Sequence, residues 1–482
     1  MTSIDGLITG MNTTDTINQL MQVEAAPQTA LKTKISTANK VVSAYQSVNT
    51  RLSSLASAAS ALGSSATWGA MKATSNSTAA VVSAAAGAGA GSLTFRVDKL
   101  ATTDTLTFTD QSVSSASDPA IATVMAANSF TIAVSPTDIR TITPDNKSLQ
   151  SVVTAINKES GLPYKAAAVQ IGPGQYTMQL TAKTSGAAAA IDPATLPSGL
   201  DLINPATTVI GGDAELTVGT DATYTITSAS NTFANVMSGV TVTATKAQAL
   251  TDPPVTIDVT ADAEGIATKV QAMIDNANVV LSEIASQSKI KTGAVAAGPL
   301  VGDSAMRKLS QDILSTVSAG ATGLGSNGTT ASFKDVWVST DSSGQLAFDK
   351  TKFLEVYKAD PVKTQKYFDT YEEKAGGTAA TFDPGFDTAV GLGRRLQSVA
   401  LVASVGVPNP LDPAKPKQGI MQALIKRNTD TIKGLNDQVG EWDNRLEMRR
   451  AALQKQFSNL EVALGKMQQQ SSWLAGQLAG LG

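Results

Sequence analysis

The chain offers few of the side chains that catalyse reactions or bind transition metals. Its 482 residues include no cysteine and no histidine. This composition removes thiol nucleophiles, thiolate zinc sites and the commonest general base. Catalysis by carboxylates or by lysine stays open, but no carboxylate pair stands in a recognisable catalytic arrangement. The residue types therefore predict that the protein is not an enzyme and that it binds no metal or other cofactor.

Two short motifs are better explained as loops than as ligand sites. The GAGAG run at 87–91 lacks the Lys-Ser/Thr of a phosphate-binding loop. A strand pattern follows it, where a dinucleotide-binding motif requires a helix. The DSSG run at 341–344 is typical of a hairpin turn. Neither motif predicts a bound ligand.

Charge and hydropathy narrow the class of protein further. Charged residues make up 16% of the chain, the net charge is −3 and the pI is about 5.3, which argues against a nucleic-acid partner. No run of about 18 apolar residues predicts a transmembrane segment. The N-terminus lacks the basic and apolar regions of a cleaved secretion signal. We expect a soluble protein that, if it is exported, uses a route without such a signal.

The last helix carries the strongest pattern in the chain. Apolar residues recur every seven positions, and no charged residue follows Lys466. A seven-residue repeat predicts a left-handed supercoil with a partner helix. Part of this stripe could be core within one chain, and the rest an interface with other chains. The predicted interface comprises Ile432, Val439, Trp442, Leu446, Leu453, Leu460, Met467, Trp473, Leu474 and Leu478.

The N-terminal segment has a matching pattern, and the middle of the chain has another. Leu31, Ala38, Tyr45, Leu52 and Ala59 are also seven residues apart. From about residue 64 to 262, short alternating runs rich in Val, Ile, Thr and Tyr predict antiparallel strands, interrupted by one helix near 148–160. The stretch 64–92 itself reads as linker or edge structure.

These patterns predict an α+β multidomain protein, in which the terminal helices form a coiled-coil stalk and β-rich head domains are inserted between them. The predicted domains are an N-terminal leg helix at 1–40, a helical stalk with a small hairpin at 41–66 and 263–440, a β-rich head at 67–104 and 208–262, a nested second β-rich head at 105–207, and a C-terminal coiled-coil leg at 441–482.

Several stretches resemble one known family. GLITGMNTTDTINQLMQVEAAPQTALKTK, at 6–34, resembles the N-terminus of the flagellar hook-associated protein 2 family, which caps flagellar filaments. GDAELTVG and the following TITSASNTFANVMSGVTVTAT, within 212–245, resemble its central signature. GDSAMRKL and WDNRLEMRRAALQKQF are similar to its later segments. The order and spacing of these motifs carry the resemblance.

The resemblance implies a function that composition alone does not. Members of this family leave the cell unfolded through the flagellar type III export system and form a homo-oligomeric ring at the filament tip. There they assist the folding and insertion of flagellin. The expected partners are flagellin, the hook-associated junction proteins and a cytoplasmic export chaperone at the C-terminal helix, 420–482. The expected location is extracellular, at the flagellum tip.

Two alternatives come from other classes of protein. A surface adhesin would use the threonine-rich β head at 64–262 to bind host mucin or glycans. A flagellin-type filament subunit would also have helical ends around a β insert, but the SNTF and GVTV motifs resemble the cap family.

Overall fold

The computed structural model describes residues 12–108, 118–135, 137–202, 205–220, 223–374, 382–412 and 414–479. It comprises two compact units, Met1–Ser64 with Ala263–Gly482, and Ser65–Asp262. The first unit is mainly helical and the second is built from antiparallel sheets. The predicted α+β class, with sheets inserted between terminal helices, is confirmed.

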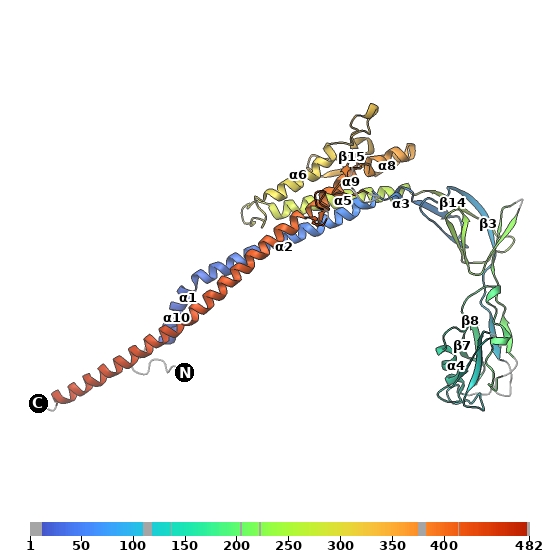
Figure 1. The fold of residues 1–482 in the computed structure, drawn as a ribbon, viewed down its shortest axis with the longest axis horizontal. Coiled ribbons are helices and arrows are strands. Elements are labelled where there is room, and N and C mark those ends of the chain that lie inside the picture. Colours follow the sequence, from blue (N-terminus) through green and yellow to red (C-terminus); the bar gives the residue numbers. More distant parts are fainter. Residues whose placement is uncertain are drawn as a thin grey trace. The chain divides into compact units, whose positions relative to one another are not determined.

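Two long helices, which run antiparallel, pair along the helical unit (Figure 1). The helices are α2, Ala26–Ala61, and α10, Ile420–Ala479, and α1, Thr13–Glu24, precedes α2. Pro27 lies in the first turn of α2, where its missing N–H costs nothing. The predicted limits at 40 and 440 fall within α2 and α10, both continuous there, and these limits stay a prediction.

The second half of α2 lies in the main core of this unit. Val48, Leu52, Leu55 and Leu62 have no exposed surface. They recur at helical spacing on the side of α2 that packs against α5 and α9. The surrounding helices are α5, Ala263–Ser288, α6, Ser304–Ser318, and α9, Leu392–Ala403.

Smaller elements pack beside these helices. The predicted DSSG hairpin joins β15 and β16, with Gly344 in the left-handed region at φ 77°. Trp337, just before β15, has a φ of 58°, and Lys352 Nζ lies 3.9 Å from the centre of its ring. The elements are η3, Ser326–Gly328; η4, Phe333–Val336; β15, Val338–Thr340; β16, Leu346–Phe348; α7, Lys350–Ala359; α8, Pro361–Asp369; β17, Tyr371–Glu372; β18, Thr388–Ala389; β19, Gly406–Val407; and β20, Lys417–Gln418.

The β-rich unit has two hydrophobic cores. The first lies between a five-stranded sheet of order β1-β14-β3-β10-β11 and a three-stranded sheet of order β12-β13-β2. The stretch predicted as linker or edge structure contains the edge strands β1 and β2. The strands are β1, Met71–Ser75; β2, Ala80–Ala84; β3, Gly91–Lys99; β10, Ala214–Val218; β11, Tyr224–Ser228; β12, Thr232–Met237; β13, Val240–Ala244; and β14, Val255–Ala261, preceded by α3, Ser65–Trp68.

The second core belongs to the chain between β3 and β10. A four-stranded sheet of order β7-β8-β4-β9, a β5–β6 hairpin and the predicted helix α4 surround it. The buried Asp104 carboxylate accepts hydrogen bonds from the N–H groups of Ile191, at 2.7 Å, and Gly211, at 3.4 Å. The elements are β4, Thr105–Phe108; β5, Phe130–Ser135; β6, Asp138–Ile142; α4, Leu149–Lys158; β7, Tyr164–Gly172; β8, Gln175–Ala182; η1, Ala187–Ala189; η2, Pro193–Thr195; and β9, Pro205–Val209.

Arg394 connects the end of α2 to the end of α8 through hydrogen bonds. The buried Arg394 guanidinium of α9 donates to the carbonyl of Gly63, at 2.7 Å, and to that of Asp369, at 3.3 Å. A Cβ at residue 63 would lie 2.2 Å from this group, so any larger residue there would displace the guanidinium. The cation also lies 4.9 Å from the centre of the Phe382 ring. It thereby satisfies a carbonyl that follows the last turn of α2.

We expect Arg394→Met to destabilise the helical unit by about 2–3 kcal/mol, because a charged hydrogen-bond donor is lost from two carbonyls. Thermal unfolding followed by circular dichroism at the helical band would measure the loss. Arg307→Met is the matched control, since Arg307 is exposed and its side chain donates a long hydrogen bond, at 3.4 Å, to the carbonyl of Gly302. Equal stability of the two variants would contradict the assigned role.

The contact between α5 and α2 predicts a pH dependence. Hydrogen bonds from Gln287 and Ser47, at 2.8 Å and 2.7 Å, hold the pKa of Glu283 below its ordinary value of 4.5. A depressed carboxyl pKa stabilises the fold above the unfolded-state pKa, and this stabilisation is lost as pH falls through the folded-state pKa. Glu283→Gln should therefore lose less stability than the wild type below pH 4.5.

Denaturation midpoints at about pH 6 and about pH 3.5 would measure this difference. The control is Asp275→Asn, which removes an exposed carboxylate from the same helix and should keep the wild-type response. An identical response of Glu283→Gln and the wild type would count against the contact.

Candidate assembly surface on the terminal helices

The first half of the α10 stripe packs within the chain. Leu453 of α10 is 7% exposed and forms a cluster with Ile17 and Met21 of α1. Leu446 and Phe457 pack against this cluster. Ile432, Val439 and Trp442 are half-buried and belong to the same stripe. These residues therefore stabilise the pairing of α10 with α1 and α2.

Polar contacts set the register of this pairing. The side-chain amide of Gln28 donates to the Asp443 carboxylate. Arg449 Nε lies 3.2 Å from the Glu24 carboxylate. The second contact is exposed at both ends and contributes little free energy. Because Gln28 contacts Asp443 and the earlier Glu24 contacts the later Arg449, α1 and α2 run antiparallel to α10.

The end of α10 is exposed. We name residues 466–479 the α10 tail; each of its residues is exposed. Met467, Trp473, Leu474 and Leu478 are 55–67% exposed, and Leu460, just before the tail, is 45% exposed. Large apolar side chains at this spacing give one apolar side to a helix that, after Lys466, has no charge.

The structure thus divides the ten predicted interface residues. Ile432, Val439, Trp442, Leu446 and Leu453 are buried or half-buried within the chain, whereas Leu460, Met467, Trp473, Leu474 and Leu478 are exposed. That these ten form an interface with other chains stays a prediction, and the exposed five are the residues free to make one. Met21, which packs in the Leu453 cluster, was not predicted from the sequence, although it lies four residues after Ile17 on the same helix face.

The described residues show neither a metal site nor a membrane span. Among them, no three His, Cys, Asp or Glu side chains gather in a group that could hold a metal ion. No helix in the described ranges is long and apolar enough to cross a membrane.

Comparison with known proteins identifies related sequences. The sequence model of the flagellar hook-associated protein 2 N-terminus matches residues 9–104, and that of its C-terminus matches residues 211–469. The lateral flagellar hook-associated protein 2 of Vibrio parahaemolyticus is 24% identical over 344 residues, 70% of this chain and 69% of that protein. The A-type flagellar hook-associated protein 2 of Pseudomonas aeruginosa is 27% identical over 261 residues, 53% of this chain and 48% of that protein.

A solved structure shares the fold. The D1-D2-D3 domains of the flagellar cap protein FliD from Escherichia coli align with a TM-score of 0.54 and 22% identity, covering 80% of this chain and 99% of that one. At this level of identity the likeness establishes a common fold.

The different burial of two stripe residues gives a direct test. Leu453→Ala should destabilise the α1–α10 contact by about 2–4 kcal/mol, because it removes a buried side chain. Leu474→Ala should change the stability of the monomer by less than about 0.5 kcal/mol. Hydrogen exchange of the α1 amides, read against thermal unfolding, would measure both. A similar loss from the two variants would mean that the tail also packs within the chain.

Proposed function

The chain belongs to the flagellar hook-associated protein 2 family, and on this basis we propose that it caps the distal end of a bacterial flagellar filament. In this proposal, copies of the chain form a closed ring that assists the folding and insertion of flagellin as the filament grows. The similar protein of Escherichia coli is a flagellar cap protein. The proposed location is therefore extracellular, at the flagellum tip.

The exposed α10 tail is the observation that carries this proposal. Covering apolar surface contributes about 25 cal/mol per Å², so Trp473, Leu474 and Leu478 would each stabilise an assembly that buried them. A helix that presents large apolar side chains and no charge is suited to packing against other helices. The α10 tail would then be the part of the C-terminal leg that contacts neighbouring subunits or flagellin at the filament end.

Export and its partners follow from the same proposal. The chain would leave the cell through the flagellar type III system without a cleaved signal, and the absence of cysteine suits a chain that passes through it unfolded. A cytoplasmic chaperone would cover the C-terminal helix, 420–482, before export. Flagellin and the hook-associated junction proteins would be its partners outside the cell. The adhesin alternative gains no support from the comparisons.

A deletion strain tests the capping role. Cells without this chain should release flagellin as monomers into the medium, because incoming subunits would no longer be retained at the tip. Expression of the wild-type chain should restore filaments and motility. Normal filaments on cells that lack the chain would refute the proposal.

The triple variant Trp473→Ser, Leu474→Ser, Leu478→Ser tests the tail. We expect it to fold like the wild type and to fail to restore motility. In light scattering it should stay monomeric at concentrations at which the wild type forms an oligomer. The matched control is Gln468→Ser, Gln470→Ser, Gln477→Ser, which changes the same helix but leaves its apolar side intact. Full activity of the first variant would show that assembly depends on other surfaces.

A further inference from the structure

One stretch of α2 carries only positive charge. α2 contains Lys32, Lys34, Lys40 and Arg51 and no carboxylate. Lys32 Nζ donates to the side-chain oxygen of Gln28 at 3.2 Å. Within the part of the chain that the structure describes, none of the three lysines forms an ion pair. Lys32 and Lys40 border the same groove, and unneutralised lysines there favour a partner that supplies carboxylates.

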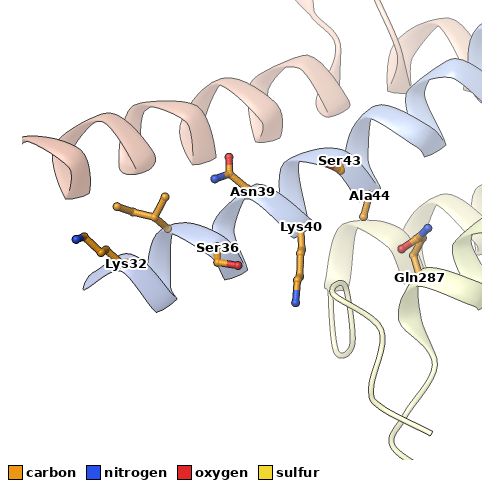
Figure 2. A pocket seen from close by; sticks show the side chains of 8 residues that line it. Lys32, Ser36, Asn39, Lys40, Ser43, Ala44 and Gln287 are labelled. Atoms are coloured by element: carbon orange, nitrogen blue, oxygen red, sulfur yellow. The ribbon is translucent and has the colours of Figure 1, made fainter. Parts of the chain in front are cut away.

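Lys32 and Lys40 flank a groove on the outer side of α2. The groove has a volume of about 610 Å³. Ile35, Ser36 and Asn39 line the groove between the two lysines, Ser43 and Ala44 line it beyond Lys40, and Gln287 of α5 lies at one end. Figure 2 shows Lys40 directed away from α10. The groove exists because α5 ends at Ser288 and no longer covers α2, and small side chains leave room for another helix.

A carboxylate-bearing surface lies on α10 of the same unit. Residues 436–447 contain four carboxylates and one arginine. Asp443 is bound by Gln28, but Asp437 and Glu441 are exposed and four residues apart, so they lie on one helix face. Val439 and Trp442, between and beside them, turn inward as half-buried residues. Glu441 makes only a long, exposed contact of 3.7 Å with Arg445.

The antiparallel register places these two surfaces at the same height along the stalk. Gln28 contacts Asp443, and both helices advance by about 1.5 Å per residue. Lys32 therefore lies level with roughly residue 439, between Asp437 and Glu441. By the same count Lys40 lies level with residue 431, next to Asp430, whose carboxylate is 2.9 Å from Lys426. Two copies placed side by side would therefore bring Lys32 of one copy opposite Asp437 and Glu441 of the other without an offset along the helices.

We propose that the α2 groove of one subunit binds the Asp437–Glu441 face of α10 in a second copy. This inference rests on the ring proposed above. A closed ring of more than two copies needs two different, complementary surfaces on each subunit, and these two surfaces satisfy that requirement. The contact is electrostatic and exposed at its rim, so high salt weakens it.

Charge reversal tests the contact in the full-length chain. Variant A carries Lys32→Glu and Lys40→Glu, and variant B carries Asp437→Lys and Glu441→Lys. Each alone should form the ring only at concentrations at least tenfold above the wild type, because like charges then meet. A chain that carries both sets of changes should restore ring formation, since every groove then again faces a surface of opposite charge, whatever the number of subunits.

Sedimentation velocity over a concentration series, at about 50 mM and about 500 mM salt, would measure assembly. The control carries Lys34→Glu and Lys358→Glu, the same change in net charge outside the groove, and should assemble like the wild type. All the substituted side chains are exposed, and circular dichroism would verify that each variant folds.

The outcomes separate this contact from the ring itself. A wild-type chain that stays monomeric at every concentration would overturn the ring and this contact with it. A normal ring in both A and B would leave the ring standing and remove this contact. Weakened assembly of A that the combined changes of A and B do not restore would show that the groove binds an acidic segment other than α10 of a second copy.

Discussion

The packing of α2 against α10 is the constraint on which the helical unit depends. These helices come from opposite ends of the chain, so no local contact holds them together. Their pairing uses the half-buried stripe of α10 and the Leu453 cluster with α1. It also leaves the second half of α2 free to enter the core with α5 and α9. A sheet unit can be inserted between α2 and α5 because both of its connections leave from this core.

The fold was largely predictable from periodicity. Which residues of the α10 stripe are buried within the chain, and which are exposed, was not predictable. A spacing of seven requires a partner helix without stating whether that partner belongs to the same chain. Leu453 and Leu474 occupy equivalent positions in the repeat, yet one is 7% and the other 57% exposed. The difference arises because Leu453 packs against Ile17 and Met21 of α1, whereas Leu474 stays exposed among the residues that the structure describes. Which part of the stripe is covered depends on tertiary packing, and the repeat itself does not encode it.

Other features lay beyond sequence reasoning because they depend on a distant contact or on unfavourable local conformations. Arg394 is one of two adjacent arginines, and only the position of Gly63, some 330 residues earlier, makes it a cap for α2. Trp337 occupies the left-handed region that bulky residues avoid, so no propensity would place it there. The groove on α2 is likewise defined by where α5 ends. Strands with strict alternation, such as β10 and β13, were predicted, whereas the alanine-rich edge strands were less distinct.

The α10 tail also has a dynamic consequence. Within the described residues, all 14 residues of the tail are exposed. An isolated helix of this length is marginally stable in water, and Gly476 lowers its stability by about 1 kcal/mol relative to alanine. Helix–coil relaxation of such a segment takes about a microsecond or less. The tail can thus melt and re-form many times while the core of the unit stays intact. A contact made by the tail can therefore break and form again without unfolding of the helical unit that carries it.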